Sequence, residues 1–315
     1  MAGRWPALDF EAEKSVYATV HAYLQVVGKL PTRALPWCNH SWHLAMLVVP
    51  RGFRTYPVEM PGGEVELLFD CLGSRVVAVT SDGRDASLAI TGQSVADFHR
   101  ELADMLRRLG VETSIDGGPN EVEVAVPFAE DTAPRQWDAD VVARLYRAFA
   151  DAARVLYQFR TGFVGKSSPV HLFWGSFDLA VTRFSGREAP LHPGGFPNLP
   201  DEVTREAYSH EVASFGFWPG GGGVNEAAFY AYGYPTPEGL GSGKPPVEGA
   251  TWNTALGEYV LPYDSVRCAA QPERLLLDFL ENAYDEVAQR AAWDRAALDI
   301  PQGRKGKPYD VATRF

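Results

Sequence analysis

Cysteine is scarce in this chain, and its scarcity excludes two classes of protein. The 315 residues include only three cysteines, Cys38, Cys71 and Cys268, which lie far apart and form no CxxC pair. An odd number of scattered cysteines is typical of reduced thiols rather than of a disulfide framework or a structural zinc bound by cysteine. We therefore expect a cytoplasmic protein.

Long apolar runs and an excess of positive charge are also missing. The opening residues MAGRWPALDFEAEKS lack the apolar segment of a signal peptide, and no later run reaches the roughly 20 apolar residues of a membrane span. The net charge is -11, whereas nucleic-acid binding requires a concentrated basic face. Neither a membrane nor a nucleic acid is expected as a partner, and the oligomeric state is left open.

Helical and strand-like patterns alternate along the rest of the chain. Asp9 caps a first predicted helix, which we expect to end near Gly28-Lys29. At that end the positive charge of the lysine would interact favourably with the helix dipole. Strand-like runs follow, and Ser94 with Asp97 resembles a capping box that opens a second helix. A third helix, 138–164, has apolar residues at steps of three and four, and further strands and a closing helix follow it.

The same order of elements therefore occurs twice. The pattern predicts an α+β fold made of two diverged copies of a helix, antiparallel strands, helix unit, packed as a pseudo-dimer. We place the first half at 1–120, a connection at 121–137 and the second half, with loop insertions, at 138–298. A basic tail, 299–315, is expected to be poorly ordered.

The stretch from Lys166 to Tyr234 has the composition expected of pocket walls. Three of the seven histidines lie here among aromatic residues, glycines and prolines. If 171–178 is one continuous strand, His171 shares its side with Phe177, and Asp178 lies on the opposite side. This stretch is where we expect a functional site.

A divalent metal held by histidine and carboxylate side chains is the first hypothesis for that site. Neutral imidazoles and a carboxylate are a ligand set that suits iron, zinc or manganese. His40 and His43 share a face if the loop that carries them is helical. The predicted metal ligands are His40, His43, His171, His210 and Glu211. This hypothesis describes an enzyme that acts on a small molecule, with its site between the two halves, and a non-haem iron centre is one form of it.

Two alternatives need no metal. One is a small-molecule binding protein with an aromatic-lined pocket, and the other is a hydrolase that uses the carboxylates Asp178 or Glu211. The residues predicted to be catalytic are Asp178, Arg183 and Tyr208, and those predicted to bind substrate are Trp174, Phe177, Trp218, Tyr232 and His192. No nucleotide cofactor is expected, because the glycine-rich WPGGGGVN lacks the residues of a P-loop and the G-x-G-x-x-G spacing.

Several long motifs resemble those of a known bacterial family. The motifs are SPVHLFWGSFDLAVTRFSGR, HPGG, PNLPDEVTREAYSHEV and GFWPGGGG, and the opening WPAL and the NHSWH segment fit as well. The family is classed only as a domain of unknown function, and the resemblance covers nearly the whole chain except the tail. It implies no activity, substrate or cofactor, so the functional hypotheses depend on the residues themselves.

Overall fold

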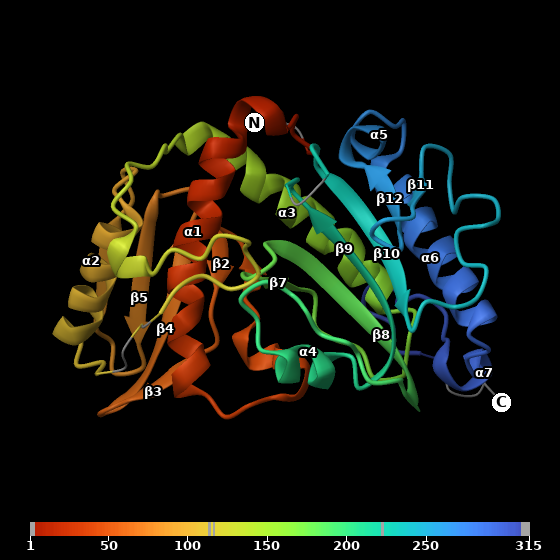
Figure 1. Ribbon diagram of the computed structural model, residues 1–315, viewed down its shortest axis with the longest axis horizontal. Coiled ribbons are helices and arrows are strands. Elements are labelled where there is room, and N and C mark those ends of the chain that lie inside the picture. The colour runs from red at the N-terminus through yellow and green to blue at the C-terminus, as the bar shows by residue number, and fades with distance from the viewer. Residues whose placement is uncertain (1–3, 113–114, 116, 222–223, 310–315) are drawn as a thin grey trace. The chain divides into compact units, whose positions relative to one another are not determined.

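A computed structural model describes residues 4–112, 115, 117–221 and 224–309 of the chain (Figure 1). It contains helices and two antiparallel sheets, which confirms the α+β class. The chain divides into two compact units. Unit 1 comprises Met1–Ala150, His171–Asp178 and Pro193–Ala207, and unit 2 comprises Asp151–Val170, Leu179–His192 and Tyr208–Phe315. The packing of two copies as a pseudo-dimer stays a prediction.

Unit 1 opens with the helix α1 (Phe10–Ala34). Asp9 is its N-cap, and the Asp9 side chain accepts a hydrogen bond from the Ala12 N–H, as predicted. The predicted end at Gly28-Lys29 is wrong, because the helix continues to Ala34, five residues beyond Lys29. Gly28 instead allows close packing of the Trp174 ring on the helix, because a Cβ at this position would lie 2.4 Å from that ring.

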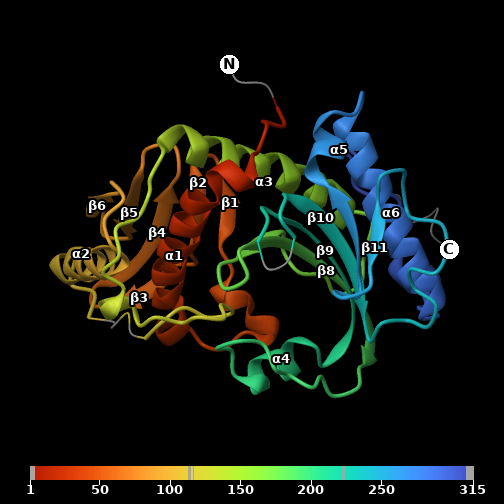
Figure 2. The ribbon, with the colours of Figure 1, turned by 45° about the horizontal axis from the view of Figure 1, so that its top comes forward.

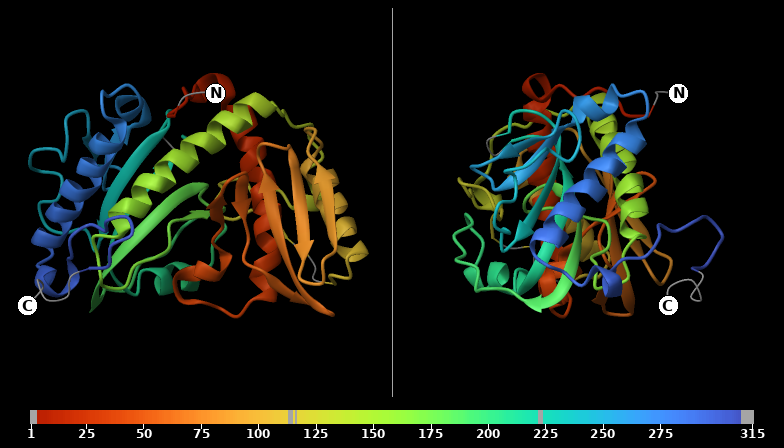
Figure 3. Two further views of the ribbon diagram at one scale, coloured as in Figure 1. Left: turned by 180° about the vertical axis from the view of Figure 1, so that it is seen from behind. Right: turned by 90° about the vertical axis from the view of Figure 1, so that its right-hand side faces the viewer.

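The sheet of unit 1 contains β1 (Leu47–Val49), β2 (Gly52–Arg54), β3 (Val58–Met60), β4 (Gly63–Asp70), β5 (Arg75–Thr80) and β6 (Asp85–Ala89). Its order is β1-β2-β4-β5-β6, and β3 pairs with β4. Helices α1 and α2 (Val95–Arg108) cover one face, and the view from behind in Figure 3 shows the strands in front of α1. Ser94 Oγ accepts a hydrogen bond from the Asp97 N–H at 3.0 Å, which confirms the predicted N-terminus of α2.

Four shorter elements complete unit 1. They are the 3-10 helices η1 (Asn39–Leu44) and η2 (Phe128–Glu130), the strand β7 (His171–Phe173) and the helix α4 (Asp201–Ala207). The helix α4 packs beside η1 (Figure 2). The helix α3 (Ala139–Arg160) contributes residues to both units.

Unit 2 has a second antiparallel sheet. Its strands β8 (Asp178–Glu188), β9 (His210–Trp218), β10 (Ala228–Tyr234), β11 (Thr251–Asn253) and β12 (Glu258–Pro262) run in the order β11-β12-β10-β9-β8. The helix α6 (Pro272–Arg290) packs against β9 and β10, and α5 (Tyr263–Arg267) and α7 (Arg295–Leu298) flank it in sequence. Phe159, Phe215 and Tyr284 are buried, and the Phe159 ring meets the other two edge-on.

The predicted continuous strand at 171–178 is interrupted. The chain turns at 174–177, and Phe177 has a positive φ of 58°. The Trp174 indole N–H donates to the Leu44 carbonyl at 3.0 Å and anchors this turn within unit 1. The predicted alternation of faces therefore does not extend beyond Phe173, because a strand keeps its period of two only while it stays extended.

The described part of the tail is bonded to the rest of unit 2. Gln302 Nε2 donates to Glu281 Oε1 at 2.7 Å, and the Gly303 N–H donates to Thr161 Oγ1 at 2.9 Å. The remaining tail positions, 310–315, lie outside the described residues. Among the helices that the structure describes, none is both long enough and apolar enough to cross a membrane.

Candidate functional site

One side of α1 carries three polar residues at steps of four. His21, Gln25 and Lys29 lie one above the other because residues four apart share a helix face. His21 Nε2 lies 2.9 Å from the Gly175 carbonyl oxygen, and Gln25 Nε2 donates to the same oxygen at 3.1 Å. The 174–177 turn therefore lies directly against this helix face.

The loop after α2 meets the same helix face. Gln25 Nε2 donates to the Asn120 carbonyl at 2.8 Å, and the Asn120 N–H donates back to Gln25 Oε1 at 3.0 Å. Lys29 Nζ donates to Asn120 Oδ1 and lies 5.3 Å from the centre of the Trp174 ring. These bonds hold the segment at 120–121 beside the 174–177 turn.

Glu121 is the central residue of this cluster. Its φ is +59°, a left-handed conformation that is uncommon for glutamate, and its backbone N–H donates to the Pro197 carbonyl at 3.0 Å. The carboxylate lies against Gly175, where a Cβ would be 2.2 Å from Glu121 Oε1. No hydrogen bond is donated to this carboxylate by any residue in the part of the chain that the structure describes.

A second carboxylate and two aromatic rings complete the cluster. Ser176 Oγ donates to Asp178 Oδ1 at 2.5 Å. The rings of His21 and Phe177 stack at 5.0 Å with an interplanar angle of 9°. Trp174 and Phe177 are almost fully buried, so they are walls of the cluster rather than exposed contacts. Three predicted site residues, Trp174, Phe177 and Asp178, are thus brought together.

The ionisable groups of the cluster are shifted toward neutrality. Burial, with a further contribution from the negative charge of Asp178, raises the pKa of Glu121 from 4.5 to about 7. Burial and the nearby Arg33 lower the pKa of Lys29 from 10.5 to about 8, and burial lowers the pKa of His21. An acid and an amine that both titrate near pH 7 to 8 are suited to proton transfer.

Sequence reasoning missed most of this cluster. It assigned Lys29 to a helix terminus, whereas Lys29 lies inside α1, and it gave no role to His21, Gln25 or Glu121. A usable signal was present, because His21 and Gln25 lie eight and four residues before Lys29, which is helical spacing. Gln25 also falls among the buried positions of α1. Glu121 gave no comparable signal, because it lies in an irregular loop.

Two predicted metal ligands of unit 1, His40 and His43, have separate hydrogen-bond partners. His40 Nδ1 lies 2.8 Å from the Ala207 carbonyl oxygen, and His43 Nδ1 accepts from the Cys38 N–H at 3.2 Å. His40 and Ser41 have positive φ, so η1 is not one regular helical turn. His171 is fully buried, and its ring meets Phe173 edge-on at 4.4 Å.

The remaining predicted ligands belong to unit 2. His210 Nδ1 lies 3.1 Å from Ser209 Oγ, and Glu211 Oε2 accepts from Arg187 Nη2 at 2.7 Å. Within the described ranges, no group of three or more histidine, cysteine, aspartate or glutamate side chains is arranged to hold a metal ion. The divalent metal stays a prediction.

Three other predicted residues meet in unit 2. The hydroxyls of Tyr208 and Tyr232 lie 2.8 Å apart, and the His192 ring stacks on Tyr208 with centroids 4.7 Å apart. Trp218 lies at the end of β9, where it pairs with Ala228 of β10. The aromatic residues of this part of the sequence therefore form more than one cluster.

Arg183, also predicted to be catalytic, lies in the core of unit 2. Only 1% of its surface is exposed, and its Nη2 donates to the Phe159 carbonyl at 2.5 Å. The guanidinium carbon lies 3.6 Å from the centre of the Phe159 ring and 4.3 Å from that of Tyr284, and burial lowers the pKa of Arg183. These contacts support a structural role through cation–π packing.

Comparison with known proteins agrees with the motifs. No curated protein and no solved structure matches the chain. A family model described as "Family of unknown function (DUF5996)" matches residues 5–300, which confirms the resemblance seen in the sequence. The chain belongs to this family of unknown function.

Proposed function

We propose that this chain is an enzyme that hydrolyses a small polar molecule by proton transfer, with Glu121 as the general acid and base. The proposed site lies in unit 1, on the face of α1 that carries His21 and Lys29. The proposed function is the carboxylate hydrolase predicted from the sequence, with the addition of Glu121, which the sequence did not single out. The metal-dependent enzyme and the metal-free binding protein stay alternative predictions.

The observation that carries this proposal is the setting of the Glu121 carboxylate. The Glu121 side chain is half-buried. Carboxylates that are partly removed from water are normally hydrogen-bonded, because desolvating an unpaired charge is costly. Glu121 instead receives no hydrogen bond from the described residues, and its backbone is held at positive φ by the bond to Pro197. Unpaired polar groups and strained backbone of this kind are typical of functional sites.

The neighbouring residues supply the other roles of an acid–base site. Burial, together with the negative charge of Asp178, raises the pKa of Glu121 to about 7, so that Glu121 is partly protonated near pH 7 and can donate a proton to a leaving group. In its ionised form Glu121 takes a proton from the attacking water while the water oxygen bonds to the substrate, and it passes that proton to the leaving group as the bond to this group breaks. In this proposal Lys29, whose Nζ lies 5.3 Å from the centre of the Trp174 ring, binds a polar or anionic group of the substrate.

Activity against a panel of p-nitrophenyl esters, phosphates and glycosides tests this function. We expect Glu121→Gln to lower kcat/KM by about 100-fold or more while the far-UV circular dichroism is unchanged. Glu123→Gln is the matched control, because Glu123 lies two residues away on the same loop and is exposed. The wild-type pH–rate profile should show a group that titrates near 7.

If no substrate of the panel is hydrolysed, either the panel lacks the right substrate or the proposal is wrong. Titration of the Glu121 carboxyl, which needs no substrate, distinguishes the two. In protein labelled with ¹³C at glutamate side chains, the Glu121 carboxyl, assigned by its loss in Glu121→Gln, should titrate near pH 7. Titration near 4.5, or full activity in Glu121→Gln, contradicts the proposal.

A further inference from the structure

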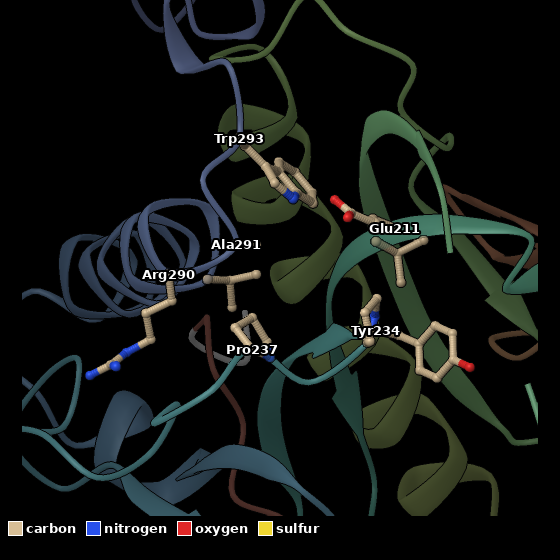
Figure 4. A pocket seen from close by; sticks show the side chains of 9 residues that line it. Glu211, Tyr234, Pro237, Arg290, Ala291 and Trp293 are labelled. Atoms are coloured by element: carbon tan, nitrogen blue, oxygen red, sulfur yellow. The ribbon is translucent and has the colours of Figure 1, made fainter. Parts of the chain in front are cut away.

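A small cavity in unit 2 is separate from the residues of the proposed hydrolase site. Its volume is about 120 Å³, and it lies between the paired ends of β9 and β10 and the C-terminal end of α6 (Figure 4). Val212, Val287 and Pro237 form apolar walls, and Ala291 lies at the helix end. Four polar residues line the cavity: Glu211, Tyr234, Arg290 and Trp293. The Tyr234 hydroxyl donates to the Pro190 carbonyl and the Arg290 guanidinium to Glu286, and both point away from the cavity in Figure 4, whereas Glu211 and Trp293 face each other across it.

Trp293 brings an unused hydrogen-bond donor to this cavity. The residue is 6% exposed, and its Nε1 is buried with no hydrogen-bond partner among the described residues. The indole N–H is a donor only and normally finds a partner when it is buried. Figure 4 shows the indole nitrogen on the cavity side, toward Glu211.

Glu211 brings an unused acceptor. Three donors, Ser185 Oγ and the Nε and Nη2 of Arg187, bond to Glu211 Oε2 at 2.7 to 3.0 Å. Oε1 accepts no hydrogen bond from the residues that the structure describes. The Arg187 pair fixes the carboxylate, and Figure 4 shows the Glu211 carboxylate directed toward Trp293.

A donor and an acceptor across an apolar cavity select a narrow class of ligand. A carboxylate has no proton for Oε1 and would face a negative charge, and an ammonium has no acceptor for the indole N–H. A neutral amide has both groups on one planar unit. The volume suits a molecule of a few heavy atoms, since a cavity of about 150 Å³ holds benzene.

We propose that this cavity binds a small neutral amide, whose carbonyl accepts from Trp293 Nε1 and whose N–H donates to Glu211 Oε1. The alkyl part of the amide packs against Val212, Val287 and Pro237. Hydrogen bonds to a buried polar group such as the Trp293 N–H discriminate against an analogue that cannot form them.

Titration of the full chain with isobutyramide and isobutyrate tests this proposal, because the two molecules share a shape and differ in the donor. The probe is the indole N–H resonance of Trp293, assigned by its absence in Trp293→Phe. We expect a saturable shift with isobutyramide and binding at least about tenfold weaker with isobutyrate. An unchanged resonance, as for a cavity that holds only water, or equal binding of the two molecules, overturns the proposal.

Ala291→Leu provides a second variant that keeps both polar groups. The larger side chain occupies the cavity, so isobutyramide should no longer shift the Trp293 resonance, although that resonance and the circular dichroism remain. Glu281→Gln is a control on the same helix, outside the cavity lining, and should bind isobutyramide as the wild type does. An undiminished response in Ala291→Leu places the ligand elsewhere and refutes the site.

Discussion

The Glu121 carboxyl should make the stability of the protein fall as pH rises, and Glu121→Gln should remove this dependence. The pKa of Glu121 is raised from 4.5 to about 7 in the folded chain. Between these values the unfolded chain has lost the proton and the folded chain still holds it, so the folded state is favoured less at each higher pH. Below pH 4.5 both states are protonated and the effect vanishes.

The size of the effect follows from this pH window. Each pH unit corresponds to about 1.4 kcal/mol, so the whole window amounts to about 3 kcal/mol. Because the Glu121 side chain is partly exposed, solvent screening lowers the expected value to about 2 kcal/mol. Glutamine is neutral at every pH, so Glu121→Gln lacks this pH dependence. The free energy of unfolding of Glu121→Gln minus that of the wild type should therefore increase by about 2 kcal/mol from about pH 5 to about pH 8.

Urea denaturation of the wild type, Glu121→Gln and Glu123→Gln, followed by tryptophan fluorescence across this pH range, measures the difference. Glu123→Gln should follow the wild type, because Glu123 is exposed on the same loop. A constant difference between Glu121→Gln and the wild type over the whole range refutes the burial of an unpaired carboxyl at this position.

Three further predictions concern individual side chains. The Lys29 Cε resonance should titrate near pH 8 rather than near 10.5, as followed by ¹³C NMR. Gly175→Ala should push the Glu121 carboxyl away from the turn, because the new Cβ would lie 2.2 Å from Oε1, and the carboxyl titration should return toward 4.5. Arg183→Met should lower the free energy of unfolding by about 2 to 4 kcal/mol in urea denaturation, since it removes a buried charged hydrogen bond to Phe159 and the cation–π contacts.

Each of these predictions has its own contradicting result. A Lys29 midpoint near 10.5 contradicts the burial of this side chain. Gly118→Ala adds a methyl group with ordinary contacts of 3.5 Å and should leave the Glu121 titration unchanged. A stability change below about 0.5 kcal/mol in Arg183→Met would show that the arginine is not structural.

The local patterns of the sequence were sufficient for much of the fold. The Asp9 cap, the capping box at Ser94 and the apolar spacing of α3 depend on residues close in sequence, and all three appear where they were predicted. The antiparallel strands followed from alternating apolar residues and turn signals in the same way. The end of α1 did not, because Gly28 lies inside the helix, where its missing side chain leaves room for Trp174, a residue far along the chain.

The candidate site shows the same division. The sequence placed Trp174, Phe177 and Asp178 in a functional region because their stretch combined aromatic and polar residues. It did not join them to Lys29 or Glu121, since the 174–177 turn breaks the expected strand and the Glu121 loop has no periodicity.

The sequence by itself determined the α+β class, the positions of the principal helices and strands, and membership of the family, because these depend on local spacing and on long motifs. Only the tertiary structure decided which ionisable groups are buried together. A pKa near 7 for Glu121 requires desolvation and the nearby charge of Asp178, and both arise from contacts between segments more than 50 residues apart. Burial and proximity are properties of the folded chain, and the chemistry proposed for this protein depends on them.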